Sequence, residues 1–305
     1  MTPDDICLPI TVIVPTYNDD DYFTEALTSI VEQTRPPAVL IVVDDGSDTS
    51  AAENSVKALQ AKGNLSTQII YLKQHNQGPS AARNAGLQLV VTPFVTFLDA
   101  DDRMLPDSLA IMYQALETLS DDYFGVYGTY SDFETGKPYA YGNLDGCIAA
   151  DRVGKKHGAA GGVHCYLFRT HKVVAIKGFD ENLINNEDFD LIIRLLKAGL
   201  KCKGKITICF EKRARFGSLS RPWQPFQAFE NTLQFLRKAE EYDYFSSREL
   251  QKRRRSAQLS YAKRLMEQGN EVEAKAVWRA ALRPFPSSQR EFYHWIMYLY
   301  LKLKR

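Results

Sequence analysis

Residues 10–119 alternate between short apolar runs and segments whose apolar residues recur at helical spacing. The apolar runs cover 10–14, 39–43, 68–72 and 94–98, and the helical segments cover 21–33, 51–62, 80–89 and 106–119. The runs are too continuously apolar for a sheet with one face in water, so we expect both faces to be covered. This alternation predicts an α/β fold with a mostly parallel central sheet flanked by helices.

Polar clusters follow three of these expected strands, at the point where each strand ends. They are Thr16, Tyr17 and Asn18; Asp44 and Asp45; and the segment 99–102. Right-handed crossovers place the carboxyl ends of parallel strands along one edge of the sheet, where ligands bind in open α/β folds. The sequence therefore predicts a ligand site built from these clusters.

Three carboxylates lie within the four positions 99–102. Clustered carboxylates repel one another unless a cation lies between them. Mg²⁺ and similar ions bind one or two protein carboxylates and add the phosphates of a ligand. The segment predicts a divalent metal that holds a diphosphate. The alternative is that Asp101 or Asp102 caps the helix expected near Pro106.

Four further positions each allow two interpretations. Asp45 either accepts a hydrogen bond from a ligand N–H or lies in a turn that caps the next helix. Arg83 either contacts a phosphate or nucleobase or pairs with an aspartate. Asp188 is either a general base or an acidic residue favoured by the N-terminus of the helix at 187–200. His164 either lines an acceptor site or is a structural histidine.

The order of these pieces resembles the family 2 glycosyltransferases, which have the GT-A fold. The matching text is VIVPTYN at 12–18, SIVEQT at 29–34, VVDDGS at 42–47, NQG at 76–78, ARNAG at 82–86, FLDADD at 97–102, GFDE at 178–181 and NED at 186–188. The resemblance covers roughly residues 10–221. It implies a glycosyltransferase domain at 1–221 followed by a C-terminal helical extension at 222–305.

The resemblance also assigns roles to individual residues. The nucleotide site it implies consists of Pro15, Thr16, Tyr17, Asn18, Asp45, Arg83, Asp99 and Ala100. Asp101 and Asp102 would bind Mn²⁺ or Mg²⁺, and Asp188 would be the catalytic base. The implied reaction is an inverting single displacement that moves a sugar from a nucleotide-diphosphate donor, by default a UDP-sugar, to a hydroxyl of a glycan or lipid-linked acceptor, as in polysaccharide biosynthesis.

One segment departs from the family pattern. Many relatives have a histidine that approaches the metal, in an Arg-x-His-x-x-Ser-like segment. Here the segment starts at Arg213 and has Arg215 at the position of that histidine. Arg215 is then expected to contact phosphate, together with Ser218 and Ser220.

The C-terminal part differs in charge from the rest of the chain. Residues 1–210 contain 27 acidic and 18 basic residues, whereas residues 211–305 contain 10 acidic and 20 basic residues. From about 226 the sequence reads as helical, and 256–284 resembles one helix–turn–helix of tetratricopeptide type. Aromatic and basic residues at 292–305 suit either a bilayer interface or packing on the protein or a second subunit. We expect peripheral membrane contact or a homodimer, and no nucleic acid partner.

The amino-acid composition limits which classes of protein this chain can belong to. With 45% hydrophobic and 25% charged residues, the chain has a globular rather than a disordered composition. The acidic residues 1–5 do not resemble a signal peptide, and five scattered cysteines suit free thiols, so we expect a cytoplasmic protein on the inner face of a membrane. Two other functions stay open: a sugar-nucleotide nucleotidyltransferase and a non-catalytic scaffold that acts through its helical tail.

Overall fold

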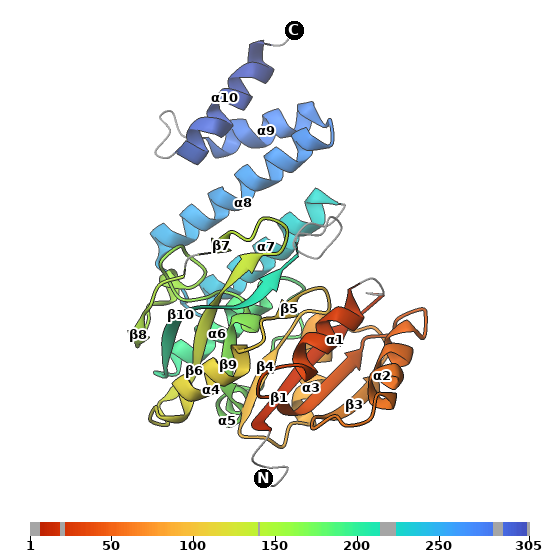
Figure 1. Cartoon of the computed structure of the whole chain (residues 1–305). Coiled ribbons are helices and arrows are strands. Elements are labelled where there is room, and N and C mark those ends of the chain that lie inside the picture. Colours follow the sequence, from red (N-terminus) through yellow and green to blue (C-terminus); the bar gives the residue numbers. More distant parts are fainter. Residues whose placement is uncertain (1–6, 19–21, 140, 214–223, 283–288, 304–305) are drawn as a thin grey trace. The chain divides into compact units, whose positions relative to one another are not determined.

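The structure is a computed structural model that describes residues 7–18, 22–139, 141–213, 224–282 and 289–303 (Figure 1). It divides into two compact units, Met1–Ala214 and Arg215–Arg305. Residues 214–223 lie outside the described ranges, so the boundary expected at 221–222 stays a prediction. Arg215, Ser218 and Ser220 lie outside them as well.

The first unit alternates strands and helices as expected. Its strands are β1 (Leu8–Thr16), β2 (Pro37–Asp44), β3 (Gln68–Lys73), β4 (Phe94–Phe97), β5 (Arg103–Met104), β6 (Tyr123–Asp132), β7 (Pro138–Tyr139), β8 (Asp145–Gly146), β9 (Tyr166–Arg169) and β10 (Lys201–Lys212). Its helices are α1 (Phe23–Val31), α2 (Ala51–Ala61), α3 (Pro79–Gln88), α4 (Ser108–Glu117), α5 (Thr170–Ala175) and α6 (Glu187–Lys197).

The strands form one sheet in the order β3-β2-β1-β4-β9-β6-β10-β5, with β7 beside β6 and β8 beside β10. The four strands predicted from apolar runs are parallel to their neighbours in this group. Beyond β4 the sheet is mixed: β9 is antiparallel to β4 and β6, whereas β10 is parallel to β6. The parallel half is the part that the sequence pattern predicted.

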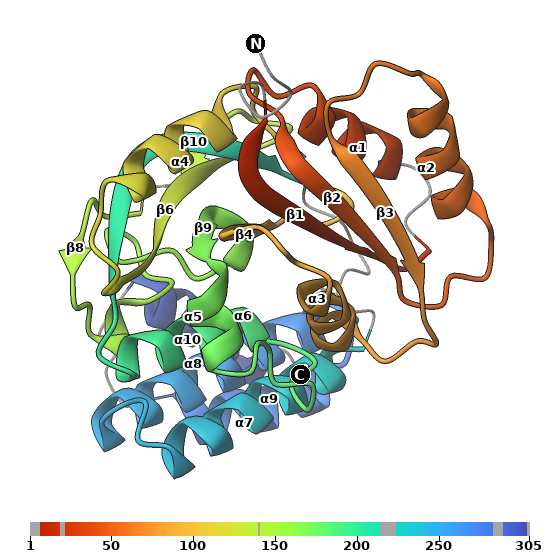
Figure 2. The same ribbon diagram turned by 90° about the horizontal axis from the view of Figure 1, so that it is seen from below.

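Helices cover both faces of this sheet. α1, α2 and α4 lie on one face, and α3, α5 and α6 lie on the other (Figure 2). The strand order runs outward from β1 to β3 and then returns to β4 on the other side of β1. With right-handed crossovers, this reversal moves α3 to the face opposite α1 and α2. The reversal leaves a switch point between the carboxyl ends of β1 and β4, where α/β folds bind ligands.

A close approach fixes α3 against the sheet. A Cβ atom at Gly86 would lie 2.7 Å from Cγ2 of Ile13 and 3.2 Å from Cγ2 of Val43, so only glycine lets the helix lie this near β1 and β2. Ile13 and Val43 are fully buried. The glycine of the ARNAG motif therefore sets the depth at which Arg83, one turn earlier on α3, lies over the ends of the strands.

The second unit consists of α7 (Pro225–Glu241), α8 (Ser247–Glu267), α9 (Glu271–Ala281) and α10 (Gln289–Leu303). Its core gathers Leu259, Tyr261, Ala262, Leu265, Ala274, Trp278, Ala281 and Leu301. The Trp278 indole N–H donates to Nδ1 of His294 across 3.0 Å. α8 and α9 with the turn at Gly269 form the helix–turn–helix expected from the sequence.

No helix in the described ranges is both long enough and apolar enough to cross a bilayer. The five cysteines are free, and Cys165, Cys202 and Cys209 are buried.

The last residue of β2, Asp44, has a buried carboxylate. Asp44 has no exposed surface, and its Oδ1 accepts the Ser47 N–H at 2.7 Å while its Oδ2 accepts the Tyr71 hydroxyl at 2.7 Å. Burial by itself raises the pKa of Asp44, but these hydrogen bonds and the Lys73 ammonium outweigh burial and lower it below its usual value. The ionised form of Asp44 therefore stabilises the folded state.

We predict that Asp44→Asn lowers the free energy of unfolding by about 1–3 kcal/mol at pH 7, because it disturbs a buried hydrogen-bonded charge. The folded pKa lies below the unfolded value of about 3.9, so this contribution is complete above that pH and disappears as the pH falls further. Urea unfolding at pH 7 and pH 3 measures it. Glu267→Gln, which breaks an exposed pair with Lys263, is the control. An equal difference between wild type and Asp44→Asn at both pH values would contradict the prediction.

Candidate active site

The turns after β1 and β2 are bound to each other at the switch point. The Asn18 N–H donates to Oγ of Ser47 at 3.0 Å, and the Asn18 amide exchanges hydrogen bonds of 3.0 and 2.9 Å with Asp48. Thr16 pairs with Asp44 in the sheet and is buried, and Pro15 lies one position earlier on β1. Tyr17 is 46% exposed, so one face of this junction presents an aromatic ring to solvent.

Asp45 is buried and holds the segment that leads into α3. Its Oδ1 accepts from the Gln74 side chain at 2.8 Å and from the Gln77 N–H at 2.9 Å. Its Oδ2 accepts from the Gly78 N–H at 2.8 Å. A carboxylate has about four acceptor positions, so the hydrogen bonds of the described residues leave one position on Oδ2 for a ligand N–H. The alternative in which this turn caps the next helix is wrong, because α2 begins only at Ala51.

The acidic segment after β4 is a tight turn in which the Asp102 N–H donates to the Asp99 carbonyl at 3.1 Å. Ala100 is buried, Asp101 is half-buried and Asp102 is 2% exposed. The alternative that Asp101 or Asp102 caps a helix is wrong, because α4 begins at Ser108 and Asp107 precedes it. Of the two interpretations of this turn, binding of a divalent metal is the one that stays open.

Arg83 joins this turn to the start of α6. Its Nη2 donates to Oδ1 of Asp99 at 2.9 Å, and its Nη1 donates to Oε1 of Glu187 at 2.8 Å. Nη1 also lies 3.7 Å from Oδ1 of Asp188, and the Arg83 side chain is only 6% exposed. The structure thus shows the pairing with an aspartate that the sequence left open. A contact of Arg83 with phosphate stays a prediction.

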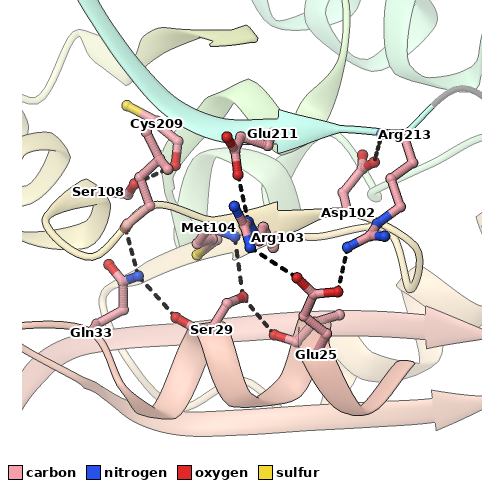
Figure 3. Close-up of polar contacts among 12 residues, drawn as sticks. Glu25, Ser29, Gln33, Asp102, Arg103, Met104, Ser108, Cys209, Glu211 and Arg213 are labelled. Carbon is pink, nitrogen blue, oxygen red and sulfur yellow. Dashed lines mark hydrogen bonds and ion pairs between the residues drawn. The ribbon is translucent and has the colours of Figure 1, made fainter. Parts of the chain in front are cut away.

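A second group of polar contacts holds Asp102 from the other side (Figure 3). Its Oδ1 accepts the Arg213 N–H at 2.9 Å, and the Arg213 guanidinium pairs with Glu25 of α1. Arg103 donates to Glu25 at 3.0 Å and pairs with Glu211 of β10. α1, β5 and the end of β10 therefore fix the backbone on both sides of Asp102.

Residues of the SIVEQT motif at 29–34 form hydrogen bonds with the segment that follows Asp102 (Figure 3). Oγ of Ser29 accepts the Met104 N–H at 3.1 Å. The Gln33 amide donates to the Leu105 carbonyl at 2.7 Å and accepts the Leu109 N–H at 3.1 Å. These two side chains tie the segment that follows Asp102 to α1 and to the residues just after it, which gives the SIVEQT motif a structural role.

Asp99, Asp102 and His164 form a group of metal-ligating side chains. One donor atom from each lies within 4.8 Å of the others. Nδ1 of His164 is 3.6 Å from Oδ2 of Asp99. Within the described part of the chain, neither this nitrogen nor Oδ2 of Asp102 makes a hydrogen bond, although both atoms are buried. Buried polar atoms rarely lack partners, so this donor set fits a divalent cation.

The charges around this group do not balance. Four carboxylates, those of Asp99, Asp102, Glu187 and Asp188, interact with the two cations Arg83 and Lys212. When all four are ionised they exceed the cations by two charges. Burial, followed by the charges of Asp99 and Asp101, raises the pKa of Asp102 to about 8 against the opposing effect of Lys212. A divalent cation would supply the missing positive charge.

The pKa values of the neighbouring groups are shifted in different directions. Burial by itself raises the pKa of Asp99, but His164 and the Arg83 charge outweigh burial and hold it well below its usual range. Burial lowers the pKa of His164, so its imidazole is neutral at pH 7 and able to bind a metal. Burial raises the pKa of Asp188 to about 6, with Glu187 acting in the same direction and Arg83 against it.

The two carboxylate oxygens of Asp188 have different surroundings. Its Oδ2 accepts the Val163 N–H at 3.2 Å, whereas its Oδ1 makes no hydrogen bond among the described residues. The side chain is 19% exposed, compared with 11% for Glu187, whose oxygen is bonded to Arg83. Asp188 is therefore the more exposed of the two acids at the start of α6, and its role as a catalytic base stays a prediction.

Asp99, Asp102, Asp188 and Arg83 thus come together, while Pro15 to Asn18 and Asp45 form the adjoining turns. Asp101 does not belong to the group of three ligating side chains, and its role as a metal ligand stays a prediction. Sequence reasoning missed the contributions of Glu187 and Lys212 and left His164 undecided. Glu187 lies in the NED motif at 186–188, but the motif does not show that it pairs with Arg83. No local pattern marks Lys212 or His164, because each meets the turn at 99–102 only through the fold.

Comparisons with known proteins decide the family. A model of the family described as "Glycosyl transferase family 2" matches residues 11–173, more than half of the chain. The chain belongs to glycosyl transferase family 2. The turns at 15–18, 44–48 and 99–102 and Arg83 lie inside the match, and Asp188 lies beyond it.

Relatives with names include glycosyltransferase GlyA of Streptococcus pneumoniae, 36% identical over 126 residues, which is 41% of this chain and 18% of GlyA. The chain thus spans less than a fifth of that relative's length. The amylovoran biosynthesis glycosyltransferase AmsB of Erwinia amylovora is 26% identical over 205 residues, or 64% of this chain and 66% of AmsB.

Solved structures confirm the GT-A glycosyltransferase fold of this family 2 chain. TarS 1–349 from S. aureus, in complex with UDP-GlcNAc, has a TM-score of 0.60 at 17% identity, covering 96% of this chain and 89% of TarS. The mannosyltransferase PcManGT from Pyrobaculum calidifontis, in complex with GDP-Man and Mn²⁺, has a TM-score of 0.61 at 17% identity, covering 96% and 85%.

We predict that Arg83→Met lowers the free energy of unfolding by about 3–5 kcal/mol, because it leaves buried carboxylates without their cation. The double variant Arg83→Met/Glu187→Gln recovers part of the loss. Urea unfolding measures both. Lys201→Met, which breaks the exposed pair with Asp122, is the control and changes stability by less than about 1 kcal/mol. A loss for Arg83→Met as small as that of the control would show that Arg83 does not hold the carboxylates together.

Proposed function

We propose that this protein is an inverting glycosyltransferase that uses a nucleotide-diphosphate sugar, by default a UDP-sugar, and transfers the sugar to a hydroxyl of a glycan or lipid-linked acceptor. The observation that carries the proposal is the meeting of the 99–102 turn with Asp188 through Arg83. This arrangement brings a diphosphate site and a carboxylate base to the same edge of the sheet.

The donor side uses the adjoining turns. The exposed ring of Tyr17 stacks on the nucleobase, and the remaining acceptor position of Asp45 takes an N–H of the base. Asp99 lies between these turns and Arg83, where it reaches the ribose or the donor sugar. Solved relatives that bind UDP-GlcNAc and GDP-Man support a nucleotide-sugar donor but leave the base and the sugar open.

Asp188 is the proposed catalytic base. Its Oδ1 accepts the proton of the acceptor hydroxyl while that oxygen attacks C1 of the donor sugar. The bond between C1 and the diphosphate oxygen breaks in the same step, its electron pair stays with the diphosphate, and the configuration at C1 inverts. A pKa of about 6 leaves Asp188 ionised at neutral pH and still able to take a proton.

Mn²⁺ or Mg²⁺ is the proposed cofactor at the 99–102 turn. Once bound, a divalent ion supplies Lewis-acid stabilisation of the departing diphosphate. Of the two proposed metal ligands, Asp102 has a buried oxygen that makes no hydrogen bond in the described ranges, and Asp101 precedes it in the chain. A solved relative that binds Mn²⁺ supports this choice without fixing the ion.

The second unit supports a role at the acceptor side. Phe292, Ile296 and Tyr300 recur every four residues along α10 and are 56%, 49% and 56% exposed. Together with the basic character of residues 211–305, this apolar face suits peripheral contact with an anionic membrane, where lipid-linked acceptors reside. A cytoplasmic location at the membrane, and a homodimer as the other use of this face, stay predictions.

A panel of UDP-, GDP- and dTDP-sugars, assayed for nucleotide release with and without Mn²⁺, tests the function. We expect Asp188→Asn to lower turnover at least about a hundredfold, because general-base catalysis contributes about 10²–10⁴. We expect the nucleotide affinity, measured by calorimetry, to stay within a few fold of wild type.

Glu181→Gln is the matched control, since this acid lies in the same segment and is exposed. Wild-type turnover in Asp188→Asn would remove Asp188 as the base. A wild-type protein that binds no nucleotide and releases none with any donor would overturn the enzymatic proposal.

A further inference from the structure

We propose that the ring of Tyr139 binds a sugar residue of the acceptor, and that the acceptor is a glycan with at least one sugar beyond the one that reacts. The inference rests on the proposed function, because it names the acceptor class of the same site. It places a sugar-binding position on the β6–β7 hairpin, separate from the turns proposed for the nucleotide.

Tyr139 is the exposed end of an aromatic cluster that extends into the site. The cluster consists of Tyr130 of β6, Tyr139 of β7, Tyr141, His164 and Phe210 of β10. Tyr141, His164 and Phe210 are buried and Tyr130 is half-buried, whereas Tyr139 is 37% exposed. The cluster therefore connects the surface of the protein with the residues around the turn at 99–102.

The inner end of the cluster lies beside the proposed base. Nδ1 of His164 is 3.6 Å from Oδ2 of Asp99, and the N–H of the preceding residue, Val163, donates to Asp188 at 3.2 Å. The turns proposed for the nucleotide follow β1 and β2, whereas β6 and β10 lie on the other side of β4 (Figure 2). A ligand on the cluster therefore approaches the site from the β6 side and leaves the β1 side to the nucleotide, as an acceptor must.

The Tyr139 ring has one face that the rest of the cluster leaves uncovered. The ring stacks on Tyr130 with centroids 5.1 Å apart and an interplanar angle of 5°, and it contacts Tyr141 at 4.9 Å. The centroids of Tyr130 and Tyr141 are only 6.1 Å apart, so these two rings do not lie across Tyr139 from each other. Together with the exposure of the side chain, this leaves a flat aromatic face for a ligand.

The β6–β7 hairpin holds this ring in a fixed position. Tyr139 pairs with Tyr130 across the two strands. In the turn, Oδ1 of Asp132 accepts the Thr135 N–H at 2.8 Å, and the Gly136 N–H donates to the Asp132 carbonyl at 2.8 Å. A ring that is already ordered loses little conformational entropy when a ligand binds, so a single stacking contact contributes to affinity.

The surroundings of Tyr139 favour a sugar over a lipid chain. One face of a pyranose ring consists of C–H groups, which pack on the electron-rich face of an aromatic ring while the sugar hydroxyls stay in water. The exposed neighbours of Tyr139 in the hairpin include Glu134, Thr135 and Lys137. A lipid chain needs a continuous apolar surface, whereas one ring in polar surroundings matches one sugar.

The position of Tyr139 in the cluster sets the minimum length of the acceptor. Tyr139 contacts the Tyr130 ring at 5.1 Å, and it is Tyr130 that contacts His164, at 6.4 Å. A sugar stacked on Tyr139 is therefore at least one ring away from the sugar whose hydroxyl meets Asp188. A monosaccharide occupies only one of these two positions, whereas a longer glycan occupies both.

An array of immobilised mono-, di- and oligosaccharides, probed with the labelled full chain in the presence of UDP and Mn²⁺, tests the inference. We expect wild type to bind glycans of two or more sugars about tenfold more tightly than monosaccharides. Tyr139→Ala should lose this preference, and Tyr139→Phe, which keeps the ring, should retain it. Tyr139→Leu should behave like Tyr139→Ala, because an aliphatic side chain offers no flat face.

The glycan that binds best then serves as the acceptor in the nucleotide-release assay. Tyr139→Ala should raise the KM for this acceptor about tenfold and leave unchanged both the KM for the sugar nucleotide and the nucleotide release without acceptor. Val91→Ala is the control, because Val91 is 88% exposed and precedes β4, at the end of the strand opposite the turn at 99–102. Thermal unfolding verifies that each variant is folded.

Wild-type glycan binding in folded Tyr139→Ala, or a wild-type protein that binds no glycan on the array, would overturn the inference. Wild-type binding in Tyr139→Leu would overturn it too, because it would identify an apolar contact of the kind that a lipid makes. If Tyr139→Ala uses a glycan acceptor as well as wild type does, the inference fails while the proposed function stands. If glycans bind through Tyr139 but no sugar nucleotide is turned over, the proposed function fails while the glycan site stands.

Discussion

The buried guanidinium of Arg83 is the interaction on which the site depends. It bonds at once to Asp99 after β4 and to Glu187 at the start of α6, segments that lie on different parts of the chain. An arginine fork satisfies two carboxylates in fixed geometry, which a lysine cannot do. Because Arg83 is nearly fully buried, its position is set by the packing of α3 on the sheet, and Gly86 sets that packing.

The pairing also explains why so much negative charge can gather here. Arg83 and Lys212 compensate part of the charge on the four carboxylates, and burial together with the charges of Asp99 and Asp101 raises the pKa of Asp102. The remaining negative charge matches a divalent cation. A network of ion pairs holds Asp102 in position, although the neighbouring carboxylates repel it. The network consists of Glu25, Arg103, Glu211 and Arg213.

Local patterns in the sequence predicted the strands of the parallel half and the helices around them. They also predicted the turns that carry Asp45 and Asp99 and the helix that begins beside Asp188. These features follow from residues close in sequence: apolar runs, helical spacing and the polar residues that end each strand. The mixed half of the sheet was harder to predict, because strands such as β5, β7 and β8 have only two residues each.

The sequence did not predict which distant residues pair with one another in the site. Arg83 reaches Glu187 across 104 positions, and Asp102 reaches the Arg213 backbone across 111. No spacing rule connects residues so far apart, and the sequence left Arg83 and His164 each with two interpretations. In the sequence, Ser29 and Gln33 were recognised only as part of a family motif. In the structure their hydrogen bonds attach the segment after Asp102 to α1 and the residues that follow it.

Anomalous diffraction at the manganese absorption edge, from crystals of the protein with UDP and Mn²⁺, tests the central claim most directly. The account predicts one strong manganese peak within bonding distance of Asp102, next to UDP phosphates, with Arg83 still paired to Asp99 and Glu187. UDP bound at another edge of the sheet, or a manganese peak away from the turn at 99–102, would contradict it.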